Sequence, residues 1–192
     1  MELLTQEEAN CYITPERENI IRECITLAID EYLSAYAELR HKHSTRTDAN
    51  IIHDLIVWNV KNKFQDEQGA IYGTKRNCFK LVLDNAIVIR FKKLNYARKA
   101  QKNCPSSQLF GFEQLSLVRA STNLNAGYQQ DGLDIRVFIT CPVDNKSNLW
   151  EWELNVMPVK PSMPHIIPPV KKRKVSAKQV KGLGTNATEN QS

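Results

Sequence analysis

The sequence predicts an α+β protein: an N-terminal helical hairpin packed on a five-stranded, mainly antiparallel sheet, followed by a disordered basic C-terminal tail. Apolar residues recur every three or four positions up to about residue 64, which is typical of amphipathic helices. After Gly69 they alternate with other residues, which is the period of half-buried strands. The last 35 residues are rich in proline and lysine. We therefore expect a single α+β globular domain over residues 1–157 and a tail over residues 158–192.

The first helix is predicted to begin at about residue 15. Thr14 supplies a hydroxyl cap, Pro15 fits the first helical position, and acidic residues follow near the positive end of the helix dipole. Its apolar stripe consists of Ile21, Ile25, Ala28, Ile29, Tyr32, Tyr36 and Leu39. After a polar break at residues 43–48, a second helical face consists of Ile52, Leu55, Ile56, Asn59, Val60 and Phe64. Two such helices joined by a short polar loop indicate a helical hairpin.

Five strands are expected in the second half of the chain. Two of them form a β-hairpin around Asp84 and Asn85, because both residues tolerate the positive φ angles of a two-residue turn. The inward-facing residues of this hairpin are predicted to be Phe79, Leu81, Leu83, Ile87, Ile89 and Phe91. A short helix is expected over residues 106–117. The remaining strands, at Asn123–Gln129, Leu133–Cys141 and Leu149–Val156, would complete an antiparallel meander.

The positive charge of the chain belongs to its tail. Residues 158–192 hold seven Lys and Arg residues against one acid, a net +6, so residues 1–157 carry about −1 of the total +5. Five prolines between residues 158 and 169 end the domain. The tail contains four consecutive cations that attract phosphates and resemble a short nuclear-import signal; they are Lys171, Lys172, Arg173 and Lys174. A solvated solubility tail is the alternative interpretation.

A second basic cluster lies within the predicted domain and holds no acid over thirteen residues; its members are Arg90, Lys92, Lys93, Arg98, Lys99 and Lys102. Strand alternation places Arg90 and Lys92 on one face, and the following loop supplies further cations that would follow a phosphate backbone. Alternatively, these cations offset Glu151 and Glu153 on a later strand. The near-neutral charge of the domain favours the second interpretation.

Signatures of catalysis and metal binding are weak. Glu151, Glu153, Asp131 and Asp134 raise the possibility of a metal-dependent nuclease, but their spacing does not predict the geometry, and we assign no catalytic residue, metal ligand or cofactor. His41 and His43 are expected to cap a helix end rather than to bind a metal.

The five cysteines lack the spacing of a metal site and fit a reduced cytoplasmic protein. Cys24, Cys78 and Cys141 are expected to be small buried residues, and Cys104 is the candidate for a reactive thiol. No apolar run is long enough to span a membrane, and the acidic N-terminus does not read as a targeting peptide. The expected location is the cytoplasm.

Residues 104–154 contain a series of short motifs: Pro105-Ser106-Ser107-Gln108, Phe112 and Gln114, Thr122-Asn123-Leu124, Gly127-Tyr128 and a final strand with tryptophans. This stretch resembles small bacterial proteins encoded near Xre-type repressors and zinc-peptidase-like partners in prophage and defence loci. The resemblance covers about a third of the chain. It implies a component of a toxin-antitoxin or antiviral defence system, with a protein partner from a neighbouring gene, and it carries over no catalytic residue.

These observations favour a non-enzymatic binding component of a bacterial toxin-antitoxin or phage-defence system. One alternative is a nucleic-acid-binding protein that uses the 90–102 cluster together with the tail, where binding would be weak and nonspecific. A second alternative is a metal-dependent nuclease.

Overall fold

The computed structural model describes residues 3–75, 78–100, 121–131, 134–143 and 147–154. The predicted tail, the short helix expected over residues 106–117, Lys102 and Cys104 lie outside these residues. The described part is α+β, as predicted. It contains the helices α1 (Gln6–Asn10), α2 (Pro15–Ala35) and α3 (Thr45–Lys63), with a 3-10 turn, η1 (Arg40–Lys42), between the last two. None of these helices is long and apolar enough to cross a membrane.

Within the described residues, six strands form one sheet in sequence order, where five were predicted. They are β1 (Ala70–Lys75), β2 (Cys78–Leu83), β3 (Ile87–Lys93), β4 (Thr122–Asp131), β5 (Asp134–Pro142) and β6 (Asn148–Leu154). The expectation of an antiparallel meander was wrong at one pair, because β3 and β4 run parallel, with Ile87 beside Thr122 and Lys93 beside Tyr128. The 28 residues that join these strands are long enough for the crossover that a parallel pair requires.

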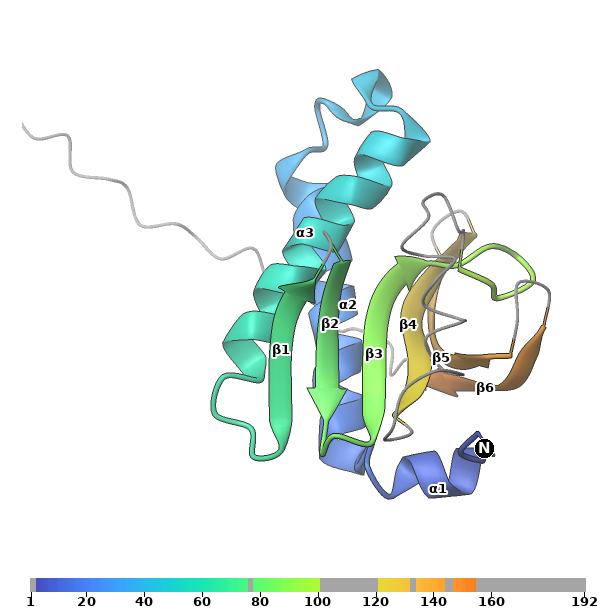
Figure 1. Ribbon diagram of the computed structural model, residues 1–192. Coiled ribbons are helices and arrows are strands. Elements are labelled where there is room, and N and C mark those ends of the chain that lie inside the picture. The colour runs from blue at the N-terminus through green and yellow to red at the C-terminus, as the bar shows by residue number, and fades with distance from the viewer. Residues whose placement is uncertain (1–2, 76–77, 101–120, 132–133, 144–146, 155–192) are drawn as a thin grey trace, which may run out of the picture. The chain divides into compact units, whose positions relative to one another are not determined.

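Helices α2 and α3 lie side by side against one face of the sheet, and α1 lies at its lower end in Figure 1. The two long helices run antiparallel, because Glu23 pairs with Lys63 while Tyr32 bonds to Asp48. Helix α2 starts at the predicted cap, where the Thr14 hydroxyl accepts from the Arg17 amide. It ends earlier than predicted, at Ala35, so Leu39 is exposed instead of buried.

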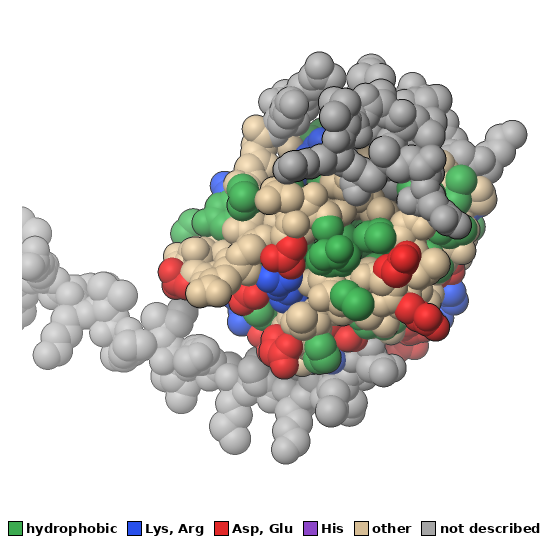
Figure 2. Space-filling view, turned by 60° about the horizontal axis from the view of Figure 1, so that its bottom comes forward, with side chains coloured by type: hydrophobic (Ala, Val, Ile, Leu, Met, Phe, Trp, Pro, Cys, Tyr) green, Lys and Arg blue, Asp and Glu red, His purple; other side chains and the backbone are tan. Residues whose placement is uncertain are grey.

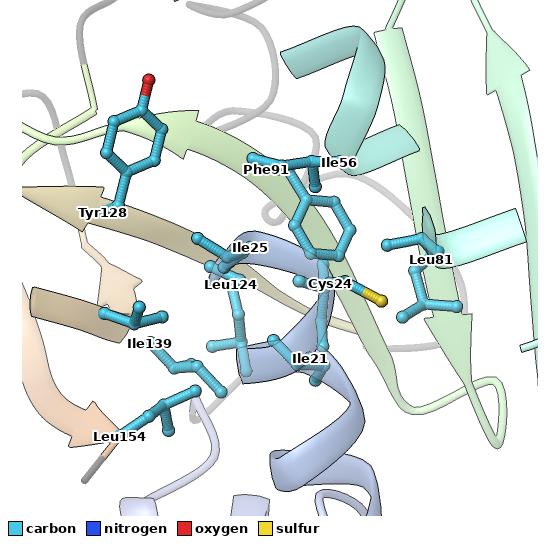
Figure 3. Close-up of a cluster of buried hydrophobic side chains, with 14 of the residues drawn as sticks. Ile21, Cys24, Ile25, Ile56, Leu81, Phe91, Leu124, Tyr128, Ile139 and Leu154 are labelled. Atoms are coloured by element: carbon cyan, nitrogen blue, oxygen red, sulfur yellow. The ribbon is translucent and has the colours of Figure 1, made fainter. Parts of the chain in front are cut away.

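One apolar core fills the space between the helices and the sheet. Side chains of α2 and α3 meet those of the central strands, as Figure 3 shows for Ile21, Ile56, Leu81 and Leu124. The predicted apolar residues of β2 and β3 are all buried in it. Burial of this many large aliphatic side chains, each contributing about 1.5–3 kcal/mol, is the main term that stabilises the fold.

Strand β1 and helix α1 were not expected. The β1 sequence is short and has Gly73 in its middle, so its period-two pattern is weak. Helix α1 has a sequence signal that was overlooked: Thr5 and Glu8 form a capping box, in which each side chain bonds to the other residue's backbone N–H.

The predicted turn between β2 and β3 is present. Asp84 and Asn85 have φ angles of 49° and 54°, and the Ala86 amide donates to the Leu83 carbonyl over 2.9 Å. This is the left-handed pair that a tight hairpin needs. The turn also binds the start of β1, since the Asp84 amide donates to the Gly69 carbonyl over 2.7 Å.

Candidate functional site

The face of the sheet that points away from α2 and α3, here called the open face, carries most of the residues singled out as candidates. A polar row crosses four strands on it: Arg90 lies beside Asn125, Asn125 opposite Thr140, and Thr140 opposite Glu151. Arg90, Asn125 and Thr140 are each at most 6% exposed. Their polar groups are therefore enclosed, and burial of such groups is costly unless hydrogen bonds replace water. The Thr140 hydroxyl has no hydrogen-bond partner within the described residues.

The chain crosses back over the open face at Gly127. A Cβ atom at this residue would lie 2.2 Å from the carbonyl oxygen of Lys92 and 2.8 Å from the Leu94 side chain. The Leu94 amide donates to the Tyr128 carbonyl over 2.9 Å, which directs the chain after β3 above β4. Glycine is required here because the backbones approach closely, not because of a special φ angle.

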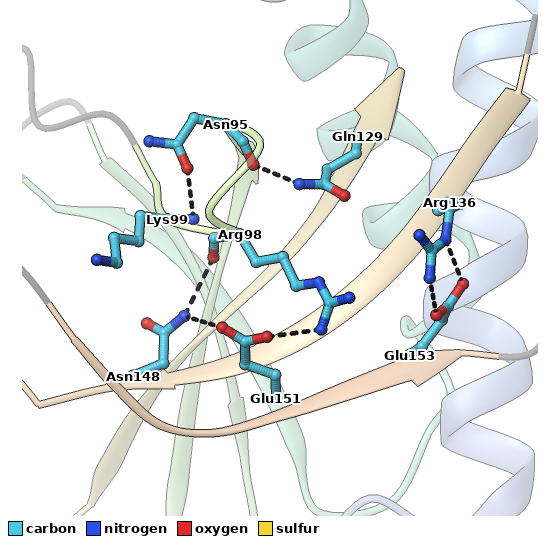
Figure 4. A network of polar contacts seen from close by, with 8 residues as sticks. All are labelled: Asn95, Arg98, Lys99, Gln129, Arg136, Asn148, Glu151 and Glu153. Carbon is cyan, nitrogen blue, oxygen red and sulfur yellow. Dashed lines mark hydrogen bonds and ion pairs between the residues drawn. The ribbon is translucent and has the colours of Figure 1, made fainter. Parts of the chain in front are cut away.

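Residues 95–100 then form a tight loop above the sheet. The Arg98 amide donates to the Asn95 carbonyl over 2.8 Å, and the Asn95 side chain accepts from the Lys99 amide over 2.9 Å. Gln129 of β4 also donates to the Asn95 carbonyl (Figure 4). Arg98 adopts a left-handed φ of 55° at the end of this loop. These contacts hold the Arg98 side chain over β5 and β6.

Two arginines lie over one buried ring on the open face. The guanidinium carbons of Arg98 and Arg136 are 4.8 and 5.2 Å from the centre of the Phe138 ring. Arg98 donates to Glu151 over 2.8 Å, and Arg136 donates to Glu153 over 2.7 Å through Nε (Figure 4). Each cation thus has a π face and a carboxylate as partners.

The carboxylates of β6 are held in the charged form. Burial alone would raise the pKa of Glu151, but hydrogen bonds from Asn148 and Arg98 outweigh it and lower the pKa. The hydrogen bond from Arg136 lowers the pKa of Glu153. Both glutamates therefore remain charged near neutral pH and compensate the arginines above them. This pairing of Arg98 with Glu151 is what the charge-compensation interpretation of the 90–102 cluster expects.

The structure does not assemble the 90–102 cluster into one exposed row. Arg90 and Lys92 share the open face as predicted, but Arg90 is 3% exposed, and its Nη2 atom lies 3.4 Å from the sulfur of Cys78. Lys93 falls on the opposite face, and Lys92, Lys93 and Lys99 are half-buried. Arg90 is therefore largely shielded from solvent, and its contact with a nucleic acid stays a prediction. Four predicted contact residues, Lys171, Lys172, Arg173 and Lys174, and also Lys102, lie outside the described residues, so nucleic-acid contact stays a prediction.

The carboxylates considered for a nuclease do not form a metal centre in the described part of the chain, where no group of three or more His, Cys, Asp or Glu side chains could hold a metal ion. Glu151 and Glu153 are engaged by arginines, and Asp131 at the end of β4 lies opposite Asp134 at the start of β5. The nuclease alternative stays a prediction.

Sequence reasoning missed a polar cluster at the α2–α3 connection. The Tyr32 hydroxyl donates to the Asp48 carboxylate and lies 3.3 Å from Nδ1 of His43. This His43 nitrogen lies 3.4 Å from the same Asp48 carboxylate. Burial raises the pKa of Tyr32 to about 12, so this phenol acts as a neutral donor. The Tyr128 hydroxyl is buried, points out of the apolar cluster in Figure 3, and has no hydrogen-bond partner within the described residues. His43 is the C-cap residue of η1, as expected, and also has a carboxylate partner.

A second missed feature is the hub formed by Arg17 near the start of α2. Its guanidinium donates to Glu67 over 2.9 Å, to Asp84 over 2.5 Å, and to the carbonyls of Tyr12 and Gln68 over 2.8 and 2.6 Å. These contacts join α2 to the α3–β1 connection and the β2–β3 turn. A signal existed in the sequence, because Arg17 lies four residues before Ile21 on the apolar stripe of α2.

The cysteines fit structural roles where they are described. Cys24 and Cys141 are buried as predicted, whereas Cys78 is half-buried and Cys11 is exposed. Burial raises the pKa of Cys24 to about 12 and that of Cys141 to about 11, which keeps both thiols protonated and unreactive.

Comparison with known proteins does not place the chain in a family. No family model matches it, and neither a curated protein nor a solved structure does so. The resemblance of residues 104–154 to defence-associated bacterial proteins stays a prediction.

Proposed function

We propose that the chain is a non-enzymatic protein-binding component of a bacterial toxin-antitoxin or phage-defence system, acting in the cytoplasm with a protein from a neighbouring gene. One observation carries the binding role: large apolar side chains are exposed on the body of the protein, while the arginines of the open face are paired internally. Trp58 is 62% exposed, Ile71 60% and Leu149 50%. Exposed apolar groups favour a protein partner, and compensated cations weaken the case for a nucleic acid.

The face in Figure 2 supports the same proposal. Hydrophobic side chains lie there among acidic and basic ones. A surface of this mixed composition suits a protein contact with complementary charge. The resemblance over residues 104–154 supplies the biological setting.

The test is co-expression of the chain with its genomic neighbours, followed by size-exclusion chromatography, together with growth and phage-plating assays for each combination. The expected result is a stable complex with one neighbour and a change in growth or plating that requires both genes. Absence of any complex, combined with unchanged growth and plating, would refute the proposal.

Nucleic-acid binding is the second candidate, and the run of cations at residues 171–174 favours it. Two variants separate the possible sites: one replaces residues 171–174 with glutamine, and the other replaces Lys92, Lys93 and Lys99. If the tail binds, the first variant loses affinity for random duplex and the salt dependence flattens by about one unit per phosphate contact removed. If wild-type protein shows no binding at low salt, this candidate fails.

A further inference from the structure

The exposed apolar residues differ in their surroundings. Ile71 is on β1 and Leu149 on β6, the two outer strands of the sheet, so they are far apart in the strand order. Trp58 of α3 and Leu27 of α2, which is 46% exposed, belong instead to two helices packed on each other. On the helical hairpin, therefore, large exposed apolar residues come from two neighbouring elements.

The contacts between α2 and α3 fix how these residues align. Lys63 pairs with Glu23 over 2.7 Å, and the Asn59 side chain donates to the Cys24 carbonyl over 3.1 Å. Residues four apart share one face of a helix, so Leu27 continues the line of Glu23 just as Leu55 continues the line of Lys63 and Asn59. Because the helices are antiparallel, Leu27 comes to lie beside Asn59 and Leu55.

Leu55 and Trp58 are three residues apart and therefore neighbours on α3. Leu55 is half-buried, whereas Trp58 lies on the side of the helix away from the buried residues Ile52, Ile56 and Val60. Leu55 also packs against the apolar core. Helix periodicity places Leu27, Leu55 and Trp58 near one another on the hairpin, in a set here called the outer strip.

The rim of the outer strip is acidic. Glu23 and Glu31 lie one turn to either side of Leu27, Asp30 lies three residues from it, and Asp54 precedes Trp58 by one turn; all four are exposed. Two cations, Lys61 and Lys63, follow Trp58 on α3. Lys63 pairs with Glu23, and the Lys61 ammonium lies 6.0 Å from the centre of the Phe79 ring, toward the sheet. The carboxylates of Asp30, Glu31 and Asp54 therefore set the sign of the charge around the strip.

We propose that the outer strip is the docking surface for a basic amphipathic helix of a partner protein, with apolar residues against Leu27, Leu55 and Trp58 and Lys or Arg residues against the acidic rim. The inference rests on the proposed protein-binding function and names its surface. Charge complementarity selects this occupant, because a neutral or acidic helix would leave the rim carboxylates desolvated and unmatched. A helix is also a suitable occupant, since helices commonly pack against the surface of a helix pair.

The direct test uses the full chain and three labelled peptides of about five helical turns: one with Leu on one face and Lys on the other, one with Glu in place of Lys, and one with the Leu/Lys sequence scrambled. Binding is followed by fluorescence anisotropy. We expect the amphipathic Lys peptide to bind and the other two to bind at least about ten-fold more weakly. Trp58→Ala should weaken binding of the Lys peptide by about 30-fold, as for a central aromatic anchor.

Ile71→Ala is the matched control, because it truncates an equally exposed apolar residue outside the strip; it should leave binding unchanged. Equal binding of the Lys peptide to wild type and Trp58→Ala would overturn the proposal, as would equal binding of the Glu peptide. A concentration-dependent dimer that is lost in Trp58→Ala would also overturn it, since a second copy would then occupy the strip.

The outcomes remain distinct from those for the proposed function. If a complex with a genomic neighbour persists in Trp58→Ala, the proposed function is supported and the outer strip is refuted as the docking surface. If the Lys peptide binds with the expected variant pattern but no neighbour complex or phenotype is found, the docking surface is supported and the proposed biological role is refuted.

Discussion

Replacing Gly127 with alanine should strongly destabilise the protein. The added Cβ would lie 2.2 Å from the Lys92 carbonyl oxygen, whereas real Cβ atoms essentially never approach a heavy atom within 3.0 Å. The strands must therefore separate locally by about 0.8 Å, and the obstructing atom is backbone in a central strand, which cannot rotate away. Overpacking of a well-packed site costs about 1–3 kcal/mol, and a backbone clash belongs at or above the upper end, about 3 kcal/mol.

Gly73→Ala is the matched control. Gly73 also lies within a strand and has φ outside the left-handed region, but nothing lies within 4 Å of an added Cβ there. Alanine at this position should be neutral or stabilise the protein by up to about 1 kcal/mol, because it restricts the unfolded chain.

The assay is urea unfolding of the full chain, followed by far-UV circular dichroism and tryptophan fluorescence, with ΔG obtained by linear extrapolation. For a domain of this size, the expected loss corresponds to a decrease in Tm of about 6–12 °C. Equal urea midpoints for the two alanine variants would refute the close crossing of the chain over β4, and with it the placement of Arg98 above Phe138.

Three further predictions concern the polar contacts and the thiols. Arg17→Ala should lower the free energy of unfolding by about 3 kcal/mol, because it leaves two partly buried carboxylates without their partner. Arg17→Lys should lower it by about half as much, because lysine cannot reproduce the guanidinium fork. Arg46→Ala, at an exposed site, should change it by less than about 0.5 kcal/mol. Equal losses for Arg17→Ala and Arg46→Ala would contradict the hub. In a double-mutant cycle, Arg98→Ala and Glu151→Ala should show a coupling energy of at most about 1 kcal/mol that decreases with salt, because the ion pair is partly exposed. A larger coupling energy that does not depend on salt would contradict this partial exposure. Burial raises the pKa of Cys24 from 9.0 to about 12, so the stabilising contribution of this thiol is full below about pH 9 and is lost as pH rises toward 12. Urea midpoints should therefore fall between these pH values, and they should fall less steeply in Cys24→Ala. An equal slope in the two proteins would argue against a buried thiol at this site.

Much of the local structure could be predicted from the sequence. The cap at Thr14, the buried stripe through Ile21 and Ile25, and the Asp84-Asn85 turn all depend on residues within a few positions of one another. Helical and strand periods report on the same short range. The α+β class and the core-facing residues therefore followed from the pattern, whereas the weak pattern around Gly73 concealed β1.

The candidate site was predictable only in part. The basic cluster and the acidic β6 strand were both visible in the sequence, and pairing between them was one of two interpretations. Arg136 and Phe138, which complete the arrangement on the open face, were not singled out because nothing local marks them. The exposed position of Trp58 was also not anticipated, since its neighbours in the sequence belong to a regular amphipathic helix.

By itself, the sequence determined the class of the fold, the buried faces of its helices and the first β-hairpin, because periodicity, capping and turn chemistry act within a few residues. The tertiary structure decided the parallel pairing of β3 with β4, the burial of Arg90 and the pairing of Arg98 with Glu151. These features bring together segments separated by many residues, and the period of a strand specifies which side chains share a face but not which strand lies beside it. The order of the strands therefore decides which charged side chains pair with one another. It thereby decides which charges remain on the surface to contact other molecules.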